Sequence, residues 1–448
     1  MSTMSTRPLA LSTDFYELTM MAGYYSAGMN DTATFELYAR DLPPHRSFLV
    51  AAGLAQALEY LEGLCFSAED IRHLRGLPAL SGVRADFFDR YLTTFRFTGD
   101  VWAVPEGTPI FPPEPLLRVT APLPEAQFVE TALLANVSFQ TSVASRATRM
   151  VEAAAGRAVV EFGSRRAHGP EAGILAARAA FLAGCESTSN VEAGRRFGIP
   201  VSGTMAHSWV TAFASETEAF RRFADVFGDS AVMLLDTYDP IAAATALGRS
   251  GLTPRGVRLD SGDFVDLSRR VRAILDAAGL PRTTIFVSGD LDEWRIADMV
   301  AAGAPIDGFG VGAALSTSSD APSLGAIYKL VEMTRDGAVV PIMKRSAGKA
   351  THPGRKQVWR VLSEDAAVKD VIGLADDAPP PHARPLLERV MTNGRRERAP
   401  STLQDLNARG RAALQALPPD VRRLRDPARY PVELTGALQA TLDRLSLA

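Results

Sequence analysis

The sequence predicts an α/β protein in which an irregular (α/β) TIM-like barrel lies between an N-terminal α+β domain and a C-terminal appendage. Between about residues 155 and 332, short apolar runs alternate with helical stretches. This alternation is typical of βαβ units and a parallel sheet. Nearly every run ends in polar residues. That favours a barrel over an open sheet, because the carboxyl ends of barrel strands meet on one face, where the site is built.

The segment before the barrel, predicted as an α+β domain over residues 8–150, mixes both kinds of element. A helix is expected over "TDFYELTMMAGYYSAG" (13–28) and an extended segment over "TATFELYAR" (32–40). The stretch 97–122 is Pro-rich and is predicted as β structure.

The barrel domain is predicted over residues 151–345 and the appendage over 346–448. Expected strands cover 158–162, 198–202, 231–236, 255–260, 284–289, 306–312 and 326–332. Expected helices between them cover 171–184, 214–227, 263–278 and 292–302. Within the appendage, the stretch from residue 370 to 397 contains a Pro run, and the residues after it are Arg- and Ala-rich with helical spacing.

Composition excludes several classes of function. The chain has 448 residues, a net charge of -3 and a pI near 6.1, whereas nucleic-acid binders usually carry a basic stripe. The expected ligand is therefore small. Two distant cysteines without metal spacing suit a reducing compartment, and no signal peptide or membrane span is expected. The sequence thus predicts a cytoplasmic protein without nucleic-acid or membrane partners.

Basic residues gather at two places. Arg165 and Arg166 follow an expected strand in "VEFGSRRAHGP", where guanidinium groups and free backbone N–H groups can hold a carboxylate or phosphate; a surface Arg pair is the alternative. Phe162, just ahead, can stack on a flat ring or pack in the core. The second place is "KRSAGKATHPGRK", which contains three of the five lysines, Lys344, Lys349 and Lys356. This segment is either a phosphate-binding loop or a solvated one.

Two acidic, glycine-bearing strand ends follow each other in "GVRLDSGDF" and "VSGDLDE". Arg258, Asp260 and Asp263 place a cation and two carboxylates within one turn. This cluster suits Mg²⁺ and a sugar phosphate, because Mg²⁺ takes few protein carboxylates and completes its shell with phosphate oxygens and water. A helix N-cap at Asp260 or Ser261 is the alternative, but it leaves Arg258 unexplained.

A glycine-rich stretch, "DGFGVGAALSTSS", has the G-x-G-x-x-A spacing of a dinucleotide-binding turn. The helix after it would be Ser-rich and broken by Pro322, and it comes after most of the strands. Backbone N–H groups around Gly310 and Gly312 that bind a single phosphate fit this stretch better.

His207 stands in "GTMAHSWV", between an expected strand end and an expected helix. No H-x-H, H-E-x-x-H or Cys cluster accompanies it, so a metal site is not indicated. It is either a packed histidine or, with Asp236 and Asp239 of "DTYD" at the next strand end, a base or nucleophile oriented by a carboxylate.

Eight ordered motifs over most of the chain resemble the nicotinate phosphoribosyltransferases. They are "TDFYELTM", "VEFGSRRAHGP", "STSNVEAGRRFGIPVSGTMAHSWV", "LLDTYD", "GVRLDSGDF", "GVGAALSTS", "PSLGAIYKLVE" and "KRSAGKATHPGRKQV". The resemblance implies condensation of nicotinate with phosphoribosyl pyrophosphate to nicotinate mononucleotide in NAD salvage, with ATP hydrolysis and Mg²⁺. It also implies a homodimer with active sites at the subunit interface.

The same resemblance implies roles for individual residues. His207 would be phosphorylated by ATP, with Asp236 and Asp239 orienting it. Phe162 and Tyr16, the latter from the other subunit, would sandwich the pyridine ring. Arg165 would face the phosphate or carboxylate side of the ligand and Thr204 the nicotinate pocket. The ribose phosphates and Mg²⁺ would be held by Arg258, Asp260, Gly289, Asp290, Gly312 and Thr317.

The chain departs from the family pattern at one residue and from a related family at another. Ala313 stands where family members often carry Thr after the glycine, so a hydroxyl is missing beside Gly312. Ser189 stands where related nicotinamide enzymes carry an Asp that holds the amide. The absence of that Asp favours the acid, because a buried Asp would repel a carboxylate. A nicotinamide-using enzyme and, from the "GFGVGA" turn, an NAD-dependent oxidoreductase are the alternatives.

Overall fold

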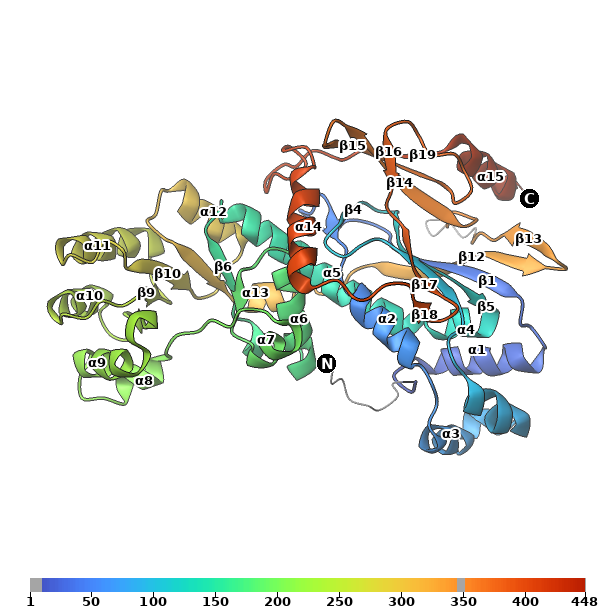
Figure 1. The fold of residues 1–448 in the computed structure, drawn as a ribbon, viewed down its shortest axis with the longest axis horizontal. Coiled ribbons are helices and arrows are strands. Elements are labelled where there is room, and N and C mark those ends of the chain that lie inside the picture. The colour runs from blue at the N-terminus through green and yellow to red at the C-terminus, as the bar shows by residue number, and fades with distance from the viewer. Residues whose placement is uncertain (1–9, 345–350, 448) are drawn as a thin grey trace. The chain divides into compact units, whose positions relative to one another are not determined.

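The computed structural model describes residues 10–344 and 351–447, which form two compact units (Figure 1). The first unit combines Met1–Ser142 with Ser323–Ala448, and the second is Val143–Pro322. Helix α5 (Glu130–Ala153) contains the residue at which the chain passes from the first unit to the second. Among the described helices, none is both long enough and apolar enough to cross a bilayer.

The first unit contains an antiparallel sheet of seven strands. In order across the sheet these are β13 (Ala338–Pro341), β12 (Ala326–Arg335), β1 (Thr32–Ala39), β5 (Pro115–Pro122), β3 (Asp100–Ala103), β17 (Glu388–Thr392) and β18 (Arg395–Arg396). Its strands bury apolar residues from both ends of the chain, and Phe35 of β1 stacks on Tyr328 of β12 with ring centroids 5.0 Å apart.

Two smaller sheets and several helices complete this unit. The four-stranded sheet has the order β16 (Ala383–Pro385), β14 (Lys356–Ser363), β15 (Ala366–Leu374) and β19 (Val432–Leu434), and a two-stranded sheet pairs β2 (Leu49–Val50) with β4 (Pro109–Ile110). The helices are α1 (Phe15–Ser26), α2 (Leu54–Gly63), α3 (Ala68–Arg75), α4 (Leu123–Phe128), α14 (Leu403–Gln415) and α15 (Gly436–Leu447).

The second unit is built on a six-stranded sheet in which every pair is parallel. The strand order is β7 (Ser187–Thr188), β6 (Ala158–Glu161), β11 (Gly308–Val311), β10 (Thr284–Ser288), β9 (Gly256–Leu259) and β8 (Val232–Leu234). Consecutive residues of a strand point to opposite faces of the sheet, and both are buried at Val159 and Val160 of β6 and at Met233 and Leu234 of β8, which explains these continuous apolar runs.

The helices of this unit alternate with the strands, as the sequence predicts. They are α6 (Pro170–Leu182), α7 (Val191–Phe197), α8 (His207–Thr211), α9 (Glu216–Phe227), α10 (Pro240–Arg249), α11 (Phe264–Ala277), α12 (Glu293–Ala301) and α13 (Ala313–Ser316). Three of them begin after an Asp whose carboxylate accepts backbone N–H groups of the first turn: Asp239, Asp263 and Asp292. Much of the acidity at the strand ends therefore serves helix capping.

Three expectations about the barrel are revised. In the described residues no hydrogen-bonded ladder joins β8 to β7, so the α/β class holds but a closed TIM-like barrel is not confirmed. The run 198–202 contributes an isolated bridge, between Val201 and Thr188, instead of a full strand. The run 326–332 belongs to β12, which pairs antiparallel with β1 in the first unit.

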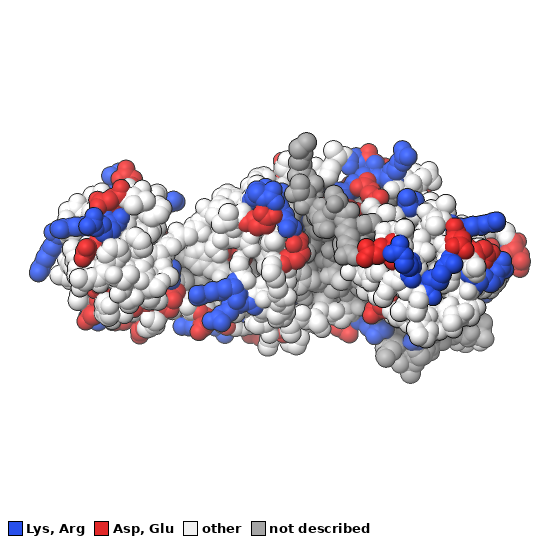
Figure 2. Space-filling model, turned by 90° about the horizontal axis from the view of Figure 1, so that it is seen from below, with Lys and Arg blue, Asp and Glu red and all other residues white. Residues whose placement is uncertain are grey.

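Charged side chains of both signs are interspersed on the face that Figure 2 shows. The described residues on this face show no wide basic surface of the kind that contacts a nucleic-acid backbone.

Candidate active site at the carboxyl edge of the parallel sheet

With one exception, the predicted site residues lie in the second unit, most of them within its parallel strands or in the turns that follow them. Phe162 and Arg165 follow β6, Asp236 and Asp239 follow β8, and Asp260 follows β9. Gly289 and Asp290 follow β10, and Gly312 follows β11. Because all these strands are parallel, the turns lie along one edge of the sheet.

His207 is the first residue of α8, and its side chain is 44 % exposed. Its Nδ1 lies 3.2 Å from Oγ1 of Thr237, and its Nε2 lies 3.8 Å from Oδ2 of Asp260. The imidazole is thus held on one side and accessible on the other, which suits a nucleophile or base better than a packed residue.

Asp236 and Asp239, the two acids predicted to orient His207, make other contacts. Asp236 accepts hydrogen bonds from the Asp260 backbone N–H at 2.9 Å and the Ser261 hydroxyl at 2.7 Å, and Asp239 caps α10. Neither hydrogen-bonds to His207: both bonds to Asp236 go to its Oδ2, while its Oδ1 is buried without a hydrogen-bond partner, and Asp239 Oδ1 accepts from the first turn of α10. Asp236 therefore shapes the turn that carries Asp260, and Asp260 and Thr237 are the groups beside the imidazole.

Arg258 links two further predicted residues. Its Nη1 donates to Oγ1 of Thr204 at 2.6 Å and to the carbonyl of Met205 at 3.1 Å, and its Nη2 lies 3.3 Å from Oδ1 of Asp260. A chain of contacts therefore runs from Thr204 through Arg258 and Asp260 to His207. The cation and the carboxylate are partly exposed, so both can meet a ligand.

The turn after β10 lies directly against this chain. The Ser288 hydroxyl donates to Oδ1 of Asp260. A Cβ at Gly289, where φ is +105°, would lie 2.0 Å from the Asp260 carbonyl oxygen, so only glycine fits there. Asp290 has an exposed side chain, and its carbonyl accepts from Arg295 at 2.8 Å.

The turn after β6 carries the two residues predicted to meet the base. The Phe162 ring is half-buried, with its centroid 5.7 Å from that of Phe286 at a tilt of 53°. Arg165 is exposed on a short 3₁₀ turn. Beneath them lies a buried carboxylate, Glu161, that the motif contains but sequence reasoning passed over.

The turn after β11 explains the glycine spacing without a dinucleotide. Gly308 and Gly310 lie inside β11, and a Cβ at Gly310 would come within 2.6 Å of the Phe162 ring. These glycines therefore make room for aromatic side chains. Gly312 precedes α13, and the hydroxyl of the half-buried Thr317 donates to the Ala313 carbonyl at 2.7 Å.

Tyr16 is the predicted residue that lies in the other unit. It belongs to α1, its side chain is 44 % exposed, and burial together with a hydrogen bond to Glu17 raises the pKa of its hydroxyl. Phe162, with which it is predicted to sandwich the pyridine ring, belongs to the second unit.

The three lysines of the segment 344–356 do not share one environment. Lys356 is fully buried in β14, with Nζ 2.8 Å from Oε2 of Glu36, so it is a structural residue and not a phosphate ligand. Lys344 is exposed, and Lys349 lies outside the described residues.

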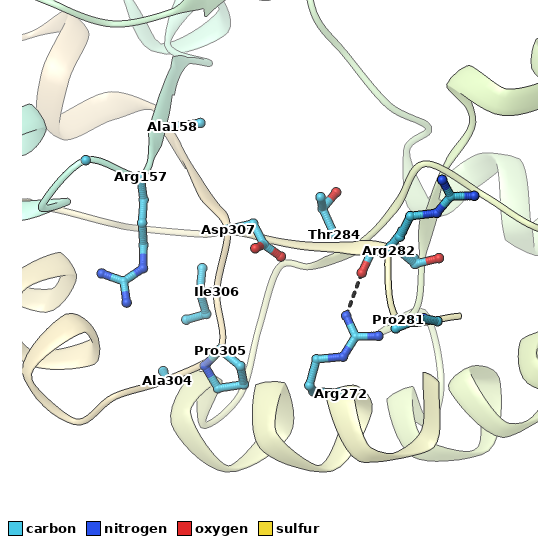
Figure 3. A pocket seen from close by; sticks show the side chains of 12 residues that line it. Arg157, Ala158, Arg272, Pro281, Arg282, Thr284, Ala304, Pro305, Ile306 and Asp307 are labelled. Carbon is cyan, nitrogen blue, oxygen red and sulfur yellow. Dashed lines mark hydrogen bonds between the residues drawn. The ribbon is translucent and has the colours of Figure 1, made fainter. Parts of the chain in front are cut away.

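A pocket of about 550 Å³ opens at the opposite edge of the parallel sheet (Figure 3). Its lining includes Arg157, Thr284 and Asp307, which lie at the amino ends of β6, β10 and β11. Arg272 reaches it but donates to the carbonyls of Thr283 and Leu280. Helices α11 and α12 end at this edge, and helix C-termini disfavour anions, so the pocket is a poor phosphate site.

Besides Glu161, sequence reasoning missed four polar residues that the structure places among the predicted ones: Thr237, Ser288, Thr188 and Asn190. Thr237 and Ser288 stand inside the motifs "DTYD" and "VSGD". Their position at polar strand ends was the signal that could have identified them.

Three successive parts of the chain match the same family of known proteins. Residues 158–373 match the nicotinate phosphoribosyltransferase (NAPRTase) family, 11–138 match its N-terminal domain and 380–442 its C-terminal domain. A nicotinate phosphoribosyltransferase of Mycobacterium tuberculosis is 48% identical over 97% of this chain and 94% of its own length. One of Bacillus subtilis is 41% identical over 82% of this chain and 77% of its own length.

Solved structures show the same fold. The crystal structure of human nicotinic acid phosphoribosyltransferase superimposes with a TM-score of 0.83 at 31% identity, over 97% of this chain and 99% of the human one. A nicotinate-nucleotide pyrophosphorylase from Pyrococcus furiosus gives 0.75 at 26% identity, over 93% and 99%. In sequence and fold together, the chain belongs to the nicotinate phosphoribosyltransferase family.

Proposed function

We propose that this chain joins nicotinate to phosphoribosyl pyrophosphate, forming nicotinate mononucleotide and pyrophosphate in NAD biosynthesis. The observation that carries the proposal is the contact chain from Thr204 through Arg258 and Asp260 to His207 at the carboxyl edge of the sheet. It places a cation, a carboxylate and an accessible imidazole side by side, in a chain similar to nicotinate phosphoribosyltransferases over 97% of its length.

In the transfer step the bond from ribose C1 to the pyrophosphate oxygen breaks, and C1 forms a bond with the pyridine nitrogen. Positive charge develops on the sugar and negative charge on pyrophosphate. Arg258 stabilises the leaving group electrostatically. The pyridine nitrogen attacks with its own lone pair, so no general base is required.

Nicotinate would stack on the exposed part of the Phe162 ring, with its carboxylate toward Arg165. A guanidinium group binds a carboxylate through two parallel hydrogen bonds. Tyr16 would close the other face of the pyridine from a second subunit, which makes the active species a homodimer. Ser189 at the end of β7 brings no carboxylate that would repel nicotinate, so the acid is favoured over nicotinamide.

Mg²⁺ would accompany the pyrophosphate group. The described residues contain no cluster of three His, Cys, Asp or Glu side chains for a metal. Asp260 and Asp290, at neighbouring strand ends, fit an ion that takes most of its ligands from phosphate and water. When bound, the ion would supply positive charge that stabilises the departing pyrophosphate.

His207 would couple ATP to synthesis, which places the enzyme in the ATP-dependent ligase class. With its proton on Nδ1, the ring donates to Thr237 and leaves the Nε2 lone pair free. Nε2 attacks the γ-phosphorus, the P–O bond to ADP breaks, and water later hydrolyses the phosphohistidine. The phosphorylated and free enzymes would differ in affinity for substrates, and this difference provides the coupling.

The deciding experiment measures product and ATP stoichiometry with purified protein, phosphoribosyl pyrophosphate and either base. We expect nicotinate mononucleotide, with ATP consumed in step with it and Mg²⁺ required. Strong turnover of nicotinamide would contradict the proposal. The cytoplasmic location remains a prediction from composition.

A further inference from the structure

A buried carboxylate lies under the turn that is proposed to bind the base. Glu161 is the last residue of β6, and its side chain is completely buried. Among the ion pairs of residues 10–344 and 351–447, none includes Glu161. A buried carboxylate without a cation is costly unless hydrogen bonds satisfy it, so its partners indicate what it is for.

Both carboxylate oxygens of Glu161 hold the ends of neighbouring strands. Oε1 accepts from the backbone N–H of Gly163, and Oε2 accepts from the Thr188 hydroxyl at 2.5 Å. The Thr188 oxygen in turn accepts from the Asn190 N–H at 3.0 Å. The end of β6 and the end of β7 are therefore joined through one side chain.

A second layer of hydrogen bonds holds the same turn from outside. The Asn190 amide donates to the Ser164 hydroxyl at 2.9 Å, and the Ser316 hydroxyl donates to the Gly163 carbonyl at 3.3 Å. A Cβ at Gly163 would lie 2.4 Å from Cβ of Ser316 and 2.9 Å from Oε1 of Glu161. The turn that separates Phe162 from Arg165 is thus fixed on several sides, while the Arg165 side chain stays exposed.

We propose that Glu161 is a positioning residue for nicotinate, which it serves through Gly163 and Thr188 without touching the substrate. This inference rests on the proposed function. Glu161 sets the path of the backbone between Phe162, which would stack on the pyridine ring, and Arg165, which would bind the nicotinate carboxylate. A rigid spacing between two groups that grip one small ligand is worth more than their separate contacts, because a shift near 1 Å costs about 100-fold in a well-aligned site.

The arrangement makes the effect selective for one substrate. Among the residues proposed for phosphoribosyl pyrophosphate, Arg258 and Asp260 belong to β9 and its turn and make other hydrogen bonds. Gly312 and Thr317 belong to the turn of Ser316, which contacts the Gly163 carbonyl and not Thr188. Loosening the network at Thr188 should therefore weaken nicotinate binding and leave phosphoribosyl pyrophosphate binding unchanged.

The test compares Thr188→Val with Thr188→Ser in the full chain. Valine keeps the shape but removes the hydroxyl that Glu161 accepts from, whereas serine keeps the hydroxyl. For Thr188→Val we expect KM for nicotinate to rise about tenfold, with KM for phosphoribosyl pyrophosphate and kcat within about twofold of the parent. Thr188→Ser should stay close to the parent in all three.

A general loss of folded protein would lower kcat and move neither KM, so the split between the two KM values identifies positioning. An unchanged KM for nicotinate in Thr188→Val, or an equal rise of both KM values, would overturn the inference. Ser164→Ala, which removes a half-buried hydroxyl of the outer layer, gives the same readout if Thr188→Val does not fold. A parent protein without nicotinate-dependent product would instead refute the proposed function.

Discussion

At the scale of single residues, the surroundings of a side chain indicate whether it serves packing or could serve chemistry. His207 in isolation fits a packed histidine, but it starts α8 with an exposed ring beside Thr237 and Asp260. Asp236 and Asp239 look equally functional in sequence, but the hydrogen bonds that they accept come from backbone N–H groups and the Ser261 hydroxyl and not from His207. Acids next to a candidate nucleophile therefore have to be compared by their hydrogen bonds.

The role of His207 can be tested by His207→Ala. We expect a folded protein that makes nicotinate mononucleotide slowly, with the ratio of rates with and without ATP falling to about one, because the phosphate acceptor is gone. Rates at saturating substrates with and without ATP measure this ratio. His73→Ala, at an exposed histidine of α3, is the matched control and should keep the stimulation. ATP stimulation that survives His207→Ala would show that another residue takes the phosphate.

A second residue-scale prediction concerns pH. Burial raises the pKa of Glu17 to about 7, so between its ordinary value and 7 the folded protein holds a proton that the unfolded chain has lost. Stability therefore falls as pH rises through this window, and it levels off above it. We expect Glu17→Gln to become more stable relative to the parent as pH increases from about 5 to about 8. Urea unfolding of both proteins at each pH measures the difference. A difference that stays constant with pH would contradict the assignment.

At the scale of elements, local pattern predicts strands and helices well but does not assign strands to sheets. The helices α6, α9, α11 and α12 lie where periodicity places them, each within two residues at its ends. The run at 326–332 is a strand as predicted, yet it pairs with β1, about 290 residues earlier in the chain. No strand was predicted after residue 332, where β14, β15 and β19 lie.

The buried pair of Lys356 in β14 and Glu36 in β1 gives an element-scale prediction. Replacing only the lysine leaves the carboxylate buried without its cation, so Lys356→Met should lower the free energy of unfolding by about 3–5 kcal/mol. Urea unfolding measures the loss. The double variant Glu36→Gln with Lys356→Met should recover part of it, because the unpaired charge is gone. Lys344→Met, at an exposed lysine, should change stability by no more than about 0.5 kcal/mol.

At the scale of the whole molecule, the proposed site needs residues from both units. Phe162, Arg258 and His207 belong to Val143–Pro322, whereas Tyr16 belongs to the unit that contains both ends of the chain. In a homodimer with shared sites, one subunit would supply Tyr16 to the site of its partner.

This arrangement predicts complementation between two inactive variants. Tyr16→Ala and Arg258→Ala should each be nearly inactive alone. When they are mixed and allowed to exchange subunits, half of the dimers are mixed and each has one intact site, so activity should return to about a quarter of the parent level. Product formation before and after exchange measures this. No recovery in a mixture whose subunits have exchanged would show that Tyr16 serves the site of its own chain.

The sequence by itself determined the family, through eight ordered motifs, and the edge of the sheet at which the chemistry is proposed, through polar residues after nearly every apolar run. These are local features, and short-range periodicity and spacing record them. Only the tertiary structure decided that Asp260 and Thr237, and not Asp236 or Asp239, lie beside His207, that Lys356 is buried against Glu36, and that Glu161 joins two strand ends. Each of these contacts links residues far apart in the chain, and such partners are set by how the strands are ordered in the sheets, which no single stretch of sequence specifies.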